Sequence, residues 1–169
     1  MRAMITRRLA REEGHKRKFL AVIDGTPECE HAVIYAAART ARSRIGGLVL
    51  LFVIQPGEFQ HWLGVEEIMR AEAREEAEAT LSHYAEMARS ELGVDPECII
   101  REGRLGEEIN GLIEEDSDIS ILVLAAASSS AEGPGPLISS LAAKSGTPFH
   151  IPVTIIPGNM TKEDILAVA

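Results

Sequence analysis

Five short apolar runs alternate along the chain with longer segments of mixed polarity. The runs lie at 19–23, 48–54, 98–101, 119–126 and 152–156. Continuous apolar runs of this length, bounded by turn residues, are typical of strands covered on both faces of a sheet. The run at 98–101 is shorter and more polar at its ends, which predicts a place nearer the sheet edge.

The segments between the runs have helical features. Thr26 offers an N-cap, Pro27 suits the first helical position and Glu28 suits the first turn, which predicts a helix to about Ile45. Its alanines would let it lie close to a sheet. Further helical elements are expected at 65–92, from 107 to the acidic run 114–118, at 137–144 and at 164–168. The expected inner face of the second helix is Ile68, Leu81, Tyr84, Ala88 and Leu92.

Strands that alternate with helices predict a doubly wound parallel sheet with helices on both faces. A chain of 169 residues suffices for one such domain. We expect a basic, disordered arm at 1–16, the domain at 17–157 and an extension at 158–169. Ligands of such sheets bind at the carboxyl ends of the strands. That rim should hold Asp24 and the loops 55–64, 103–106 and 126–136.

Charge is divided unevenly between the arm and the rest of the chain. Residues 1–18 hold seven basic and two acidic residues, a net charge of +5, whereas the whole chain is −9 and the remainder therefore −14. An acidic body argues against a nucleic-acid surface. No apolar run is long enough to span a membrane or follows the basic arm as a secretory signal, so we expect a cytoplasmic protein. Deleting the arm should leave the thermal midpoint almost unchanged.

Common catalytic and metal-binding motifs are missing from the sequence. There is no phosphate-binding loop with lysine, no dinucleotide fingerprint, no nucleophile elbow and no zinc-protease helix. The five histidines share no metal spacing. Cys29 and Cys98 form neither a metal nor a redox motif. They should lie at opposite ends of the sheet as free thiols, with Cys29 just beyond the end of the first strand and Cys98 at the start of the third. We therefore expect neither catalysis nor a bound metal.

The residues from Lys18 to Glu28, an apolar strand that runs into Asp-Gly-Thr-Pro-Glu, resemble the opening of universal stress proteins. Four later segments are similar to that family in the same order: 51–54, 101–109, 117–124 and 151–156. The resemblance covers about 17–157. It implies a flavodoxin-like five-stranded sheet in the order 3-2-1-4-5. It also implies a homodimer formed through the last strand, with Val153 and Ile155 at the interface.

The resemblance also implies a nucleotide site. Members that bind ATP carry G-x2-G-x9-G-[ST] after the fourth strand, and the ungapped spacing places this motif at Ala126, Ser129, Ser139 and Ser140. Ser140 matches, but all three glycines are replaced. By family position, Asp24 and Val53 correspond to nucleoside-contacting residues, and Ala125 also belongs to the site. The expected base pocket is thus kept while the phosphate loop has changed.

The sequence leaves three functions to compare. The first is a non-catalytic, dimeric stress-response or signalling module that binds ATP weakly or not at all, with another adenine nucleotide or a different small molecule as a possible ligand. The second is an ATP-binding switch with slow hydrolysis, which intact glycines would favour. The third, a flavodoxin-like electron carrier, lacks a hydroxyl-rich loop after the first strand. Structural roles remain open too: Asp24 could bond the loop backbone, and His61 and Trp62 could pack over the rim or form a lid.

Overall fold

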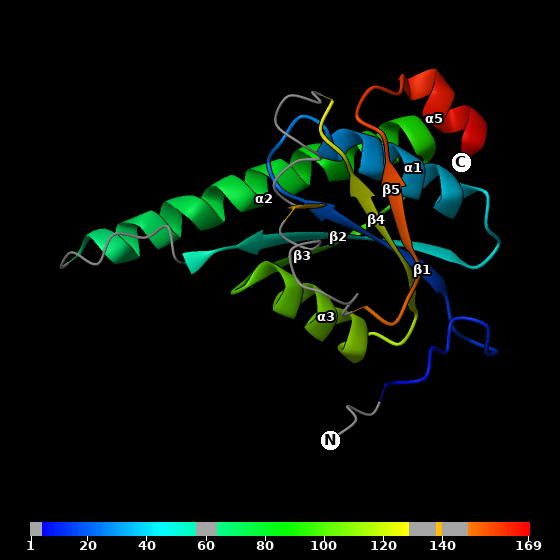
Figure 1. The fold of residues 1–169 in the computed structure, drawn as a ribbon, viewed down its shortest axis with the longest axis horizontal. Helices are drawn as coiled ribbons and strands as arrows, with labels where there is room; N and C mark the ends of the chain where they lie inside the picture. The colour runs from blue at the N-terminus through cyan, green and yellow to red at the C-terminus, as the bar shows by residue number, and fades with distance from the viewer. Residues whose placement is uncertain (1–4, 57–63, 129–137, 140–148) are drawn as a thin grey trace.

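A five-stranded, all-parallel sheet forms the centre of the molecule (Figure 1). The computed structural model describes residues 5–56, 64–128, 138–139 and 149–169. The strands are β1 (Arg17–Ile23), β2 (Gly46–Ile54), β3 (Glu97–Glu102), β4 (Ile119–Ala125) and β5 (Val153–Ile156). Their order is β3-β2-β1-β4-β5. Both the doubly wound class and the strand order expected from the sequence are confirmed.

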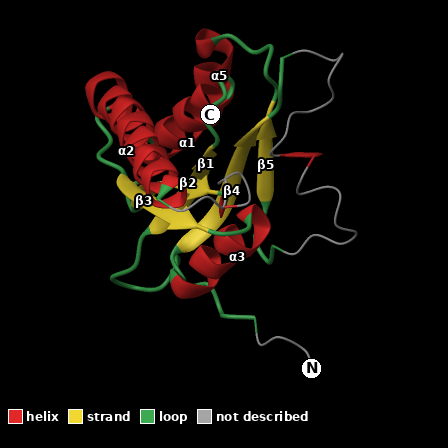
Figure 2. Cartoon of the chain, turned by 90° about the vertical axis from the view of Figure 1, so that its left-hand side faces the viewer, coloured by secondary structure: helices red, strands yellow, loops and turns green. Residues whose placement is uncertain are grey.

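Helices cover both faces of this sheet (Figure 2). One face carries α1 (Cys29–Ala41), α2 (Val65–Leu92) and α5 (Lys162–Val168), and the other carries α3 (Leu105–Glu115). Each face has its own apolar cluster, because successive residues of a strand point to opposite sides. Phe19, Ala21 and Ile23 face α1, whereas Leu20 and Val22 face α3.

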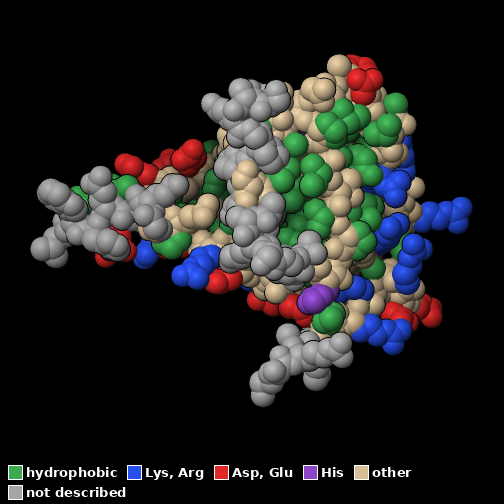
Figure 3. Space-filling model, viewed as in Figure 1, with side chains coloured by type: hydrophobic (Ala, Val, Ile, Leu, Met, Phe, Trp, Pro, Cys, Tyr) green, Lys and Arg blue, Asp and Glu red, His purple; other side chains and the backbone are tan. Residues whose placement is uncertain are grey.

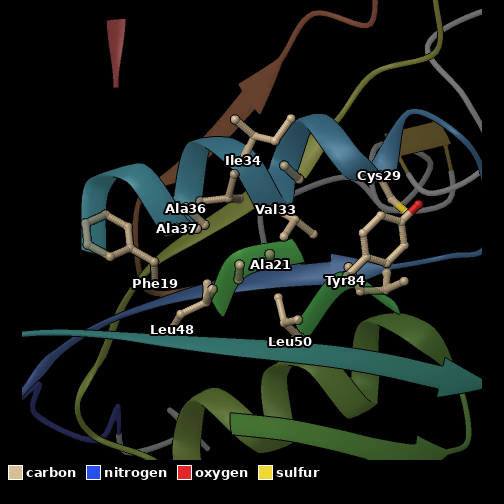
Figure 4. Packing of buried hydrophobic residues seen from close by; sticks show 14 of the residues in the cluster. Phe19, Ala21, Cys29, Val33, Ile34, Ala36, Ala37, Leu48, Leu50 and Tyr84 are labelled. Carbon is tan, nitrogen blue, oxygen red and sulfur yellow. The ribbon is translucent and has the colours of Figure 1, made fainter. Parts of the chain in front are cut away.

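Helix α1 lies close to the sheet because the residues that it presents are small. Ala32, Ala36 and Ala37 are fully buried. Figure 4 shows Val33 and Ala37 directed at Ala21 and Leu50 of the strands beneath. The start of this helix differs from the sequence prediction, since it begins at Cys29 with Glu28 as its N-cap. It also ends at Ala41, and residues 46–47 open β2 instead of only stopping the helix.

Helix α2 has the predicted bounds and ends at Gly93, whose φ of 67° is readily reached only by glycine. The predicted inner face of α2 is confirmed at Leu81, Tyr84 and Ala88, which are buried. Ile68 was assigned to the same face wrongly, because its side chain is 60% exposed. The first turn of α2, where Ile68 lies, projects beyond the sheet (Figure 1), whereas Met69 and Ala73 pack against the cluster that contains Ile54 of β2.

The residues on either side of the family-like segment pack against the domain. Arg8 donates to backbone carbonyls of Ile113, Asp116 and Ile119, and Leu9 N–H donates to Ser117 O at 2.9 Å. These contacts place residues 5–16 against the end of α3, whereas the sequence led us to expect a disordered arm. At the other terminus, 158–169 includes the helix α5, where only a final turn was expected.

Both cysteines are free, as expected from the sequence. Cys29 is buried and Cys98 is exposed on the edge strand β3. Burial raises the pKa of both thiols, so neither is activated.

We predict that a thiol reagent at mildly alkaline pH will modify one thiol quickly in the native protein and two after denaturation without reductant. The difference arises because the reagent reaches only Cys98 in the folded chain. A Cys98→Ser variant is the control and should lose the fast reaction. Fewer than two thiols in the denatured, unreduced protein would show that a bridge exists.

Candidate functional site

The carboxyl ends of β1 and β2 enclose a cavity of about 250 Å³. Asp24 and Val53 line it, together with Gln55 of the following loop and with Ala73 and Glu76 of α2. The parallel pairing of β1 with β2 brings Asp24 and Val53 together. Ile23 is paired with Phe52, and Asp24 and Val53 are the residues that follow them. The cavity is smaller than the roughly 300–1,000 Å³ of most ligand pockets.

Asp24 also has a structural role in its own loop. Its Oδ1 accepts hydrogen bonds from Thr26 N at 3.0 Å and from Thr26 Oγ1 at 2.6 Å. Gly25 between them has a φ of 78°, a conformation that glycine adopts without strain. Within the described residues no hydrogen bond reaches Oδ2 of Asp24, so one carboxylate oxygen remains for a ligand.

The segment that follows β4 has a backbone that is already engaged. Ala126 N–H donates to Ile156 O at 2.9 Å, which continues the pairing of β4 with β5. A Cβ placed on Gly158 would lie 2.3 Å from Ala126 O and 2.5 Å from Ser128 N. The chain after β5 therefore lies directly on residues 126–128. Phosphate cradles are made of free backbone N–H groups, and at Ala126 that group is occupied.

Negative charge surrounds this end of the sheet. Ser128 Oγ donates to Glu28 Oε1 at 3.3 Å, which brings a carboxylate to the segment after β4. The pKa of Glu28 is lowered by a hydrogen bond from its own backbone N–H and further by Ser128, so it is ionised at neutral pH. Asp24 and Glu76 add two carboxylates at the cavity, and no described lysine or arginine lines it.

The residues that the sequence assigned to the site are therefore only partly assembled. Asp24 and Val53 meet at the cavity. Ala125 and Ala126 are half-buried at the end of β4, and Ser139 is exposed. Ser129, Ser140, His61 and Trp62 lie outside the described residues.

At the far side of the sheet, β5 is the outermost strand. Val153 is half-buried there, and Ile155 is 49% exposed.

Three residues at this end were not identified from the sequence. Glu76 comes from the middle of a long acidic helix, where a carboxylate ordinarily signals a solvated face. Glu28 was interpreted only as a favourable residue of a first turn. Gly158 follows the edge strand β5 after Pro157, and its lack of a Cβ allows the close approach of two backbones there.

Among the described residues, no group of three or more histidine, cysteine, aspartate or glutamate side chains is arranged to hold a metal ion. In the same part of the chain, no helix combines the length and the apolar character needed to cross a membrane.

Comparison with known structures gives the same fold repeatedly. A universal stress protein from Lactobacillus plantarum superposes with a TM-score of 0.65 at 14% identity, covering 83% of this chain and 98% of that one. One from Burkholderia pseudomallei gives 0.62 at 20% identity, with coverage of 83% and 96%. One from Arabidopsis thaliana with AMP bound gives 0.56 at 15% identity, with coverage of 83% and 90%. Universal stress proteins in complex with cAMP and with dAMP are also similar.

The sequence itself supplies the assignment to a family. No curated protein matches the chain. The family model described as the universal stress protein family, however, matches residues 16–157, which is most of the chain. This range agrees with 17–157, the segment over which the sequence resembles the family, and the sheet has the strand order that the resemblance implied. The chain belongs to the universal stress protein family.

Proposed function

We propose that the chain is a dimeric, non-catalytic stress-response or signalling module that binds ATP weakly or not at all. Membership of the family supports the general role. The engaged N–H of Ala126 is the observation that supports weak binding most directly, because this residue stands where binding members have their first loop glycine. A phosphate at this position would have to replace a hydrogen bond that holds β4 to β5.

Electrostatics support the same proposal. Glu28 lies at hydrogen-bonding distance from Ser128, and Asp24 and Glu76 line the cavity beside it. A triphosphate carries about four negative charges, so three carboxylates without a described cation at the cavity oppose it. Repulsion of this kind is strongest where burial lowers the effective dielectric constant. A nucleoside without phosphates would meet no such opposition.

The alternative is an ATP-binding switch with slow hydrolysis. The meeting of Asp24 and Val53 at one cavity favours it, since these are the family positions that contact the nucleoside. Similar proteins with AMP, cAMP or dAMP bound make an adenine nucleotide a reasonable ligand to test. The two proposals differ in whether the phosphates contribute to affinity, which calorimetry can measure.

We predict that titration with Mg-ATP will give a dissociation constant far above the micromolar range. Three lost hydrogen bonds to a charged group, at about 1.5–3 kcal/mol each, remove several powers of ten in affinity. A triple variant with glycine at 126, 129 and 139 should gain affinity. Adding Glu28→Gln and Glu76→Gln should raise it further by removing two charges.

Two controls make this result specific. Asp24→Ala in the glycine variant should abolish the gained binding if the cavity holds the nucleoside. Phosphate release from ATP should stay at the uncatalysed rate in the unaltered protein. Micromolar binding of ATP by the unaltered protein, or its measurable hydrolysis, would instead support the switch.

The proposed dimer rests on the free edge of β5. Ile155 is a large apolar residue that is 49% exposed on an edge strand, and such strands tend to pair with another chain. We predict a dimer by light scattering at micromolar concentration and its dissociation by Ile155→Lys. Ile68→Lys on α2 is the matched control, because Ile68 is 60% exposed at a different part of the surface. A monomeric unaltered protein would contradict the proposal.

A further inference from the structure

A cluster of arginines lies at the end of the sheet opposite the cavity. Figure 3 shows lysine and arginine side chains gathered on the side where Figure 1 places the start of β1 and the end of α1. Arg17 begins β1, Arg39 belongs to the last turn of α1, and Arg11 comes from the N-terminal arm. Seven residues of strand separate Arg17 from Asp24, a distance of roughly 23 Å. One small ligand could not reach both ends.

Phe19 helps to fix two of these arginines. The guanidinium carbon of Arg17 lies 5.6 Å from the centroid of the Phe19 ring, and that of Arg39 lies 5.9 Å from it. Phe19 itself is only 1% exposed, so the ring is a rigid part of the core. Cation–π contacts of this kind hold guanidinium groups without consuming their hydrogen-bond donors. Within the described part of the chain, no hydrogen bond uses the side-chain donors of either arginine.

Arg11 is brought to the cluster by the docked arm. Leu9 and Arg8 are bonded to the end of α3, and Ala10 is 4% exposed. The pKa of the Arg17 guanidinium is lowered, first by burial and then by the positive charges of Arg11 and Arg39. Arg11 and Arg39 are thus each near enough to Arg17 to repel its charge. Arg11 lies outside the segment that matches the family model, whereas Arg17 and Arg39 lie inside it.

Carboxylates near this end do not compensate the cluster. Glu12 pairs with Arg7 at 2.7 Å, Asp118 pairs with His15 at 2.6 Å, and Asp116 pairs with Lys18 at 2.8 Å. Among the described residues no ion pair or hydrogen bond joins the side chain of Arg11, Arg17 or Arg39 to a carboxylate, Glu13 included. The protein has a net charge of −9, yet the positive charges of these arginines are not balanced by carboxylates. An external anion would relieve the repulsion between the guanidinium groups.

The chemistry of three guanidiniums selects the kind of anion. Each guanidinium presents a planar fork of donors that fits the oxygens of a phosphate. The protein as a whole carries a net charge of −9, which disfavours a long nucleic acid or a membrane surface. We propose that Arg11, Arg17 and Arg39 form a binding site for a small soluble ligand that carries two or more phosphate charges.

Inorganic tripolyphosphate and pyrophosphate are suitable probes, in calorimetry and in thermal unfolding at low ionic strength. Tripolyphosphate should bind the unaltered protein and raise its thermal midpoint, since a ligand of the native state stabilises it. Arg11→Gln and Arg39→Gln should each weaken binding roughly tenfold or more. Arg11 is exposed, and the cation–π contacts with Phe19 are made by Arg17 and Arg39, so the Arg11 variant tests the site without disturbing the core. Arg39→Lys keeps the charge but loses the fork and should bind with intermediate affinity.

Two charge-matched controls distinguish a site from general attraction. Arg7→Gln changes the same arm and Arg104→Gln changes a distant loop, and both side chains are 81% exposed. Each should alter the affinity by less than about twofold. No binding at about 1 mM tripolyphosphate, or equal losses in the controls, would overturn the proposal. Tighter binding of a single-stranded RNA oligonucleotide or of anionic lipid vesicles than of tripolyphosphate would also overturn it.

Discussion

Replacing Arg8 with alanine should lower the free energy of unfolding by about 1.5–3 kcal/mol, the usual range for hydrogen bonds to a charged group. Arg8 Nη1 donates to the carbonyl oxygens of Ile113, Asp116 and Ile119, which end α3 and begin β4. Helix α3 has no basic residue in its last turn and ends in Glu114 and Glu115, both unfavourable to the helix dipole. Arg8 supplies the missing positive charge from outside the helix.

Chemical denaturation of the Arg8→Ala and Arg7→Ala variants measures this contribution. Arg7 is the control because its side chain is 81% exposed and, among the described residues, pairs with Glu12 at the surface, a pair worth less than about 1 kcal/mol. Deleting 1–16 should cost more than Arg8→Ala alone, since it also removes the buried Ala10 and the bond from Leu9. Equal stability of all these proteins would show that the arm contributes nothing, as the sequence alone suggested.

The docking of the arm could not be deduced from local sequence. Residues 5–16 are charged and have no helical or strand periodicity, which ordinarily indicates a solvated leader. Arg8 and Ile113 are 105 positions apart, so only the folded chain brings the guanidinium to the end of α3. The central strands were predictable for the opposite reason. Phe19 to Ile23 form a continuous apolar run, and such runs identify buried parallel strands without knowledge of any partner.

The candidate site also has one part that the sequence predicts and one part that it does not. Asp24 and Val53 follow buried strands, and the topology of a parallel sheet places both at one rim, so their meeting could be expected. The hydrogen bond of the Ala126 N–H could not be expected from the sequence, because the N–H donates to Ile156 O through the pairing of β4 with β5. Glycine replacements in the sequence point only to the loss of conformational freedom. They give no information about which donors the fold has already used.

Helix α5 is the second addition that the sequence underestimated, and its contacts explain why it is part of the domain. Thr161 Oγ1 accepts from Asp164 N at 3.1 Å and caps its first turn. Arg42, in the turn after α1, donates to Leu166 O at 2.8 Å, which ties the last turn of α5 to the end of α1. Ile165, between these ends, is fully buried in the cluster shared by α1 and the sheet. The helix therefore covers apolar surface that would otherwise be exposed.

Ile165→Ala should lower the free energy of unfolding by about 2–5 kcal/mol, because it removes buried methylene groups and leaves a cavity. In a domain of this size the thermal midpoint should fall by roughly 5–15 °C. Val168→Ala is the matched control in the same helix, since Val168 is 62% exposed, and its effect should stay within about 0.5 kcal/mol. Calorimetric unfolding of both variants measures the difference. If Ile165→Ala were no more damaging than Val168→Ala, α5 would not be packed on α1, and residues 158–169 would be the separate extension that the sequence predicted.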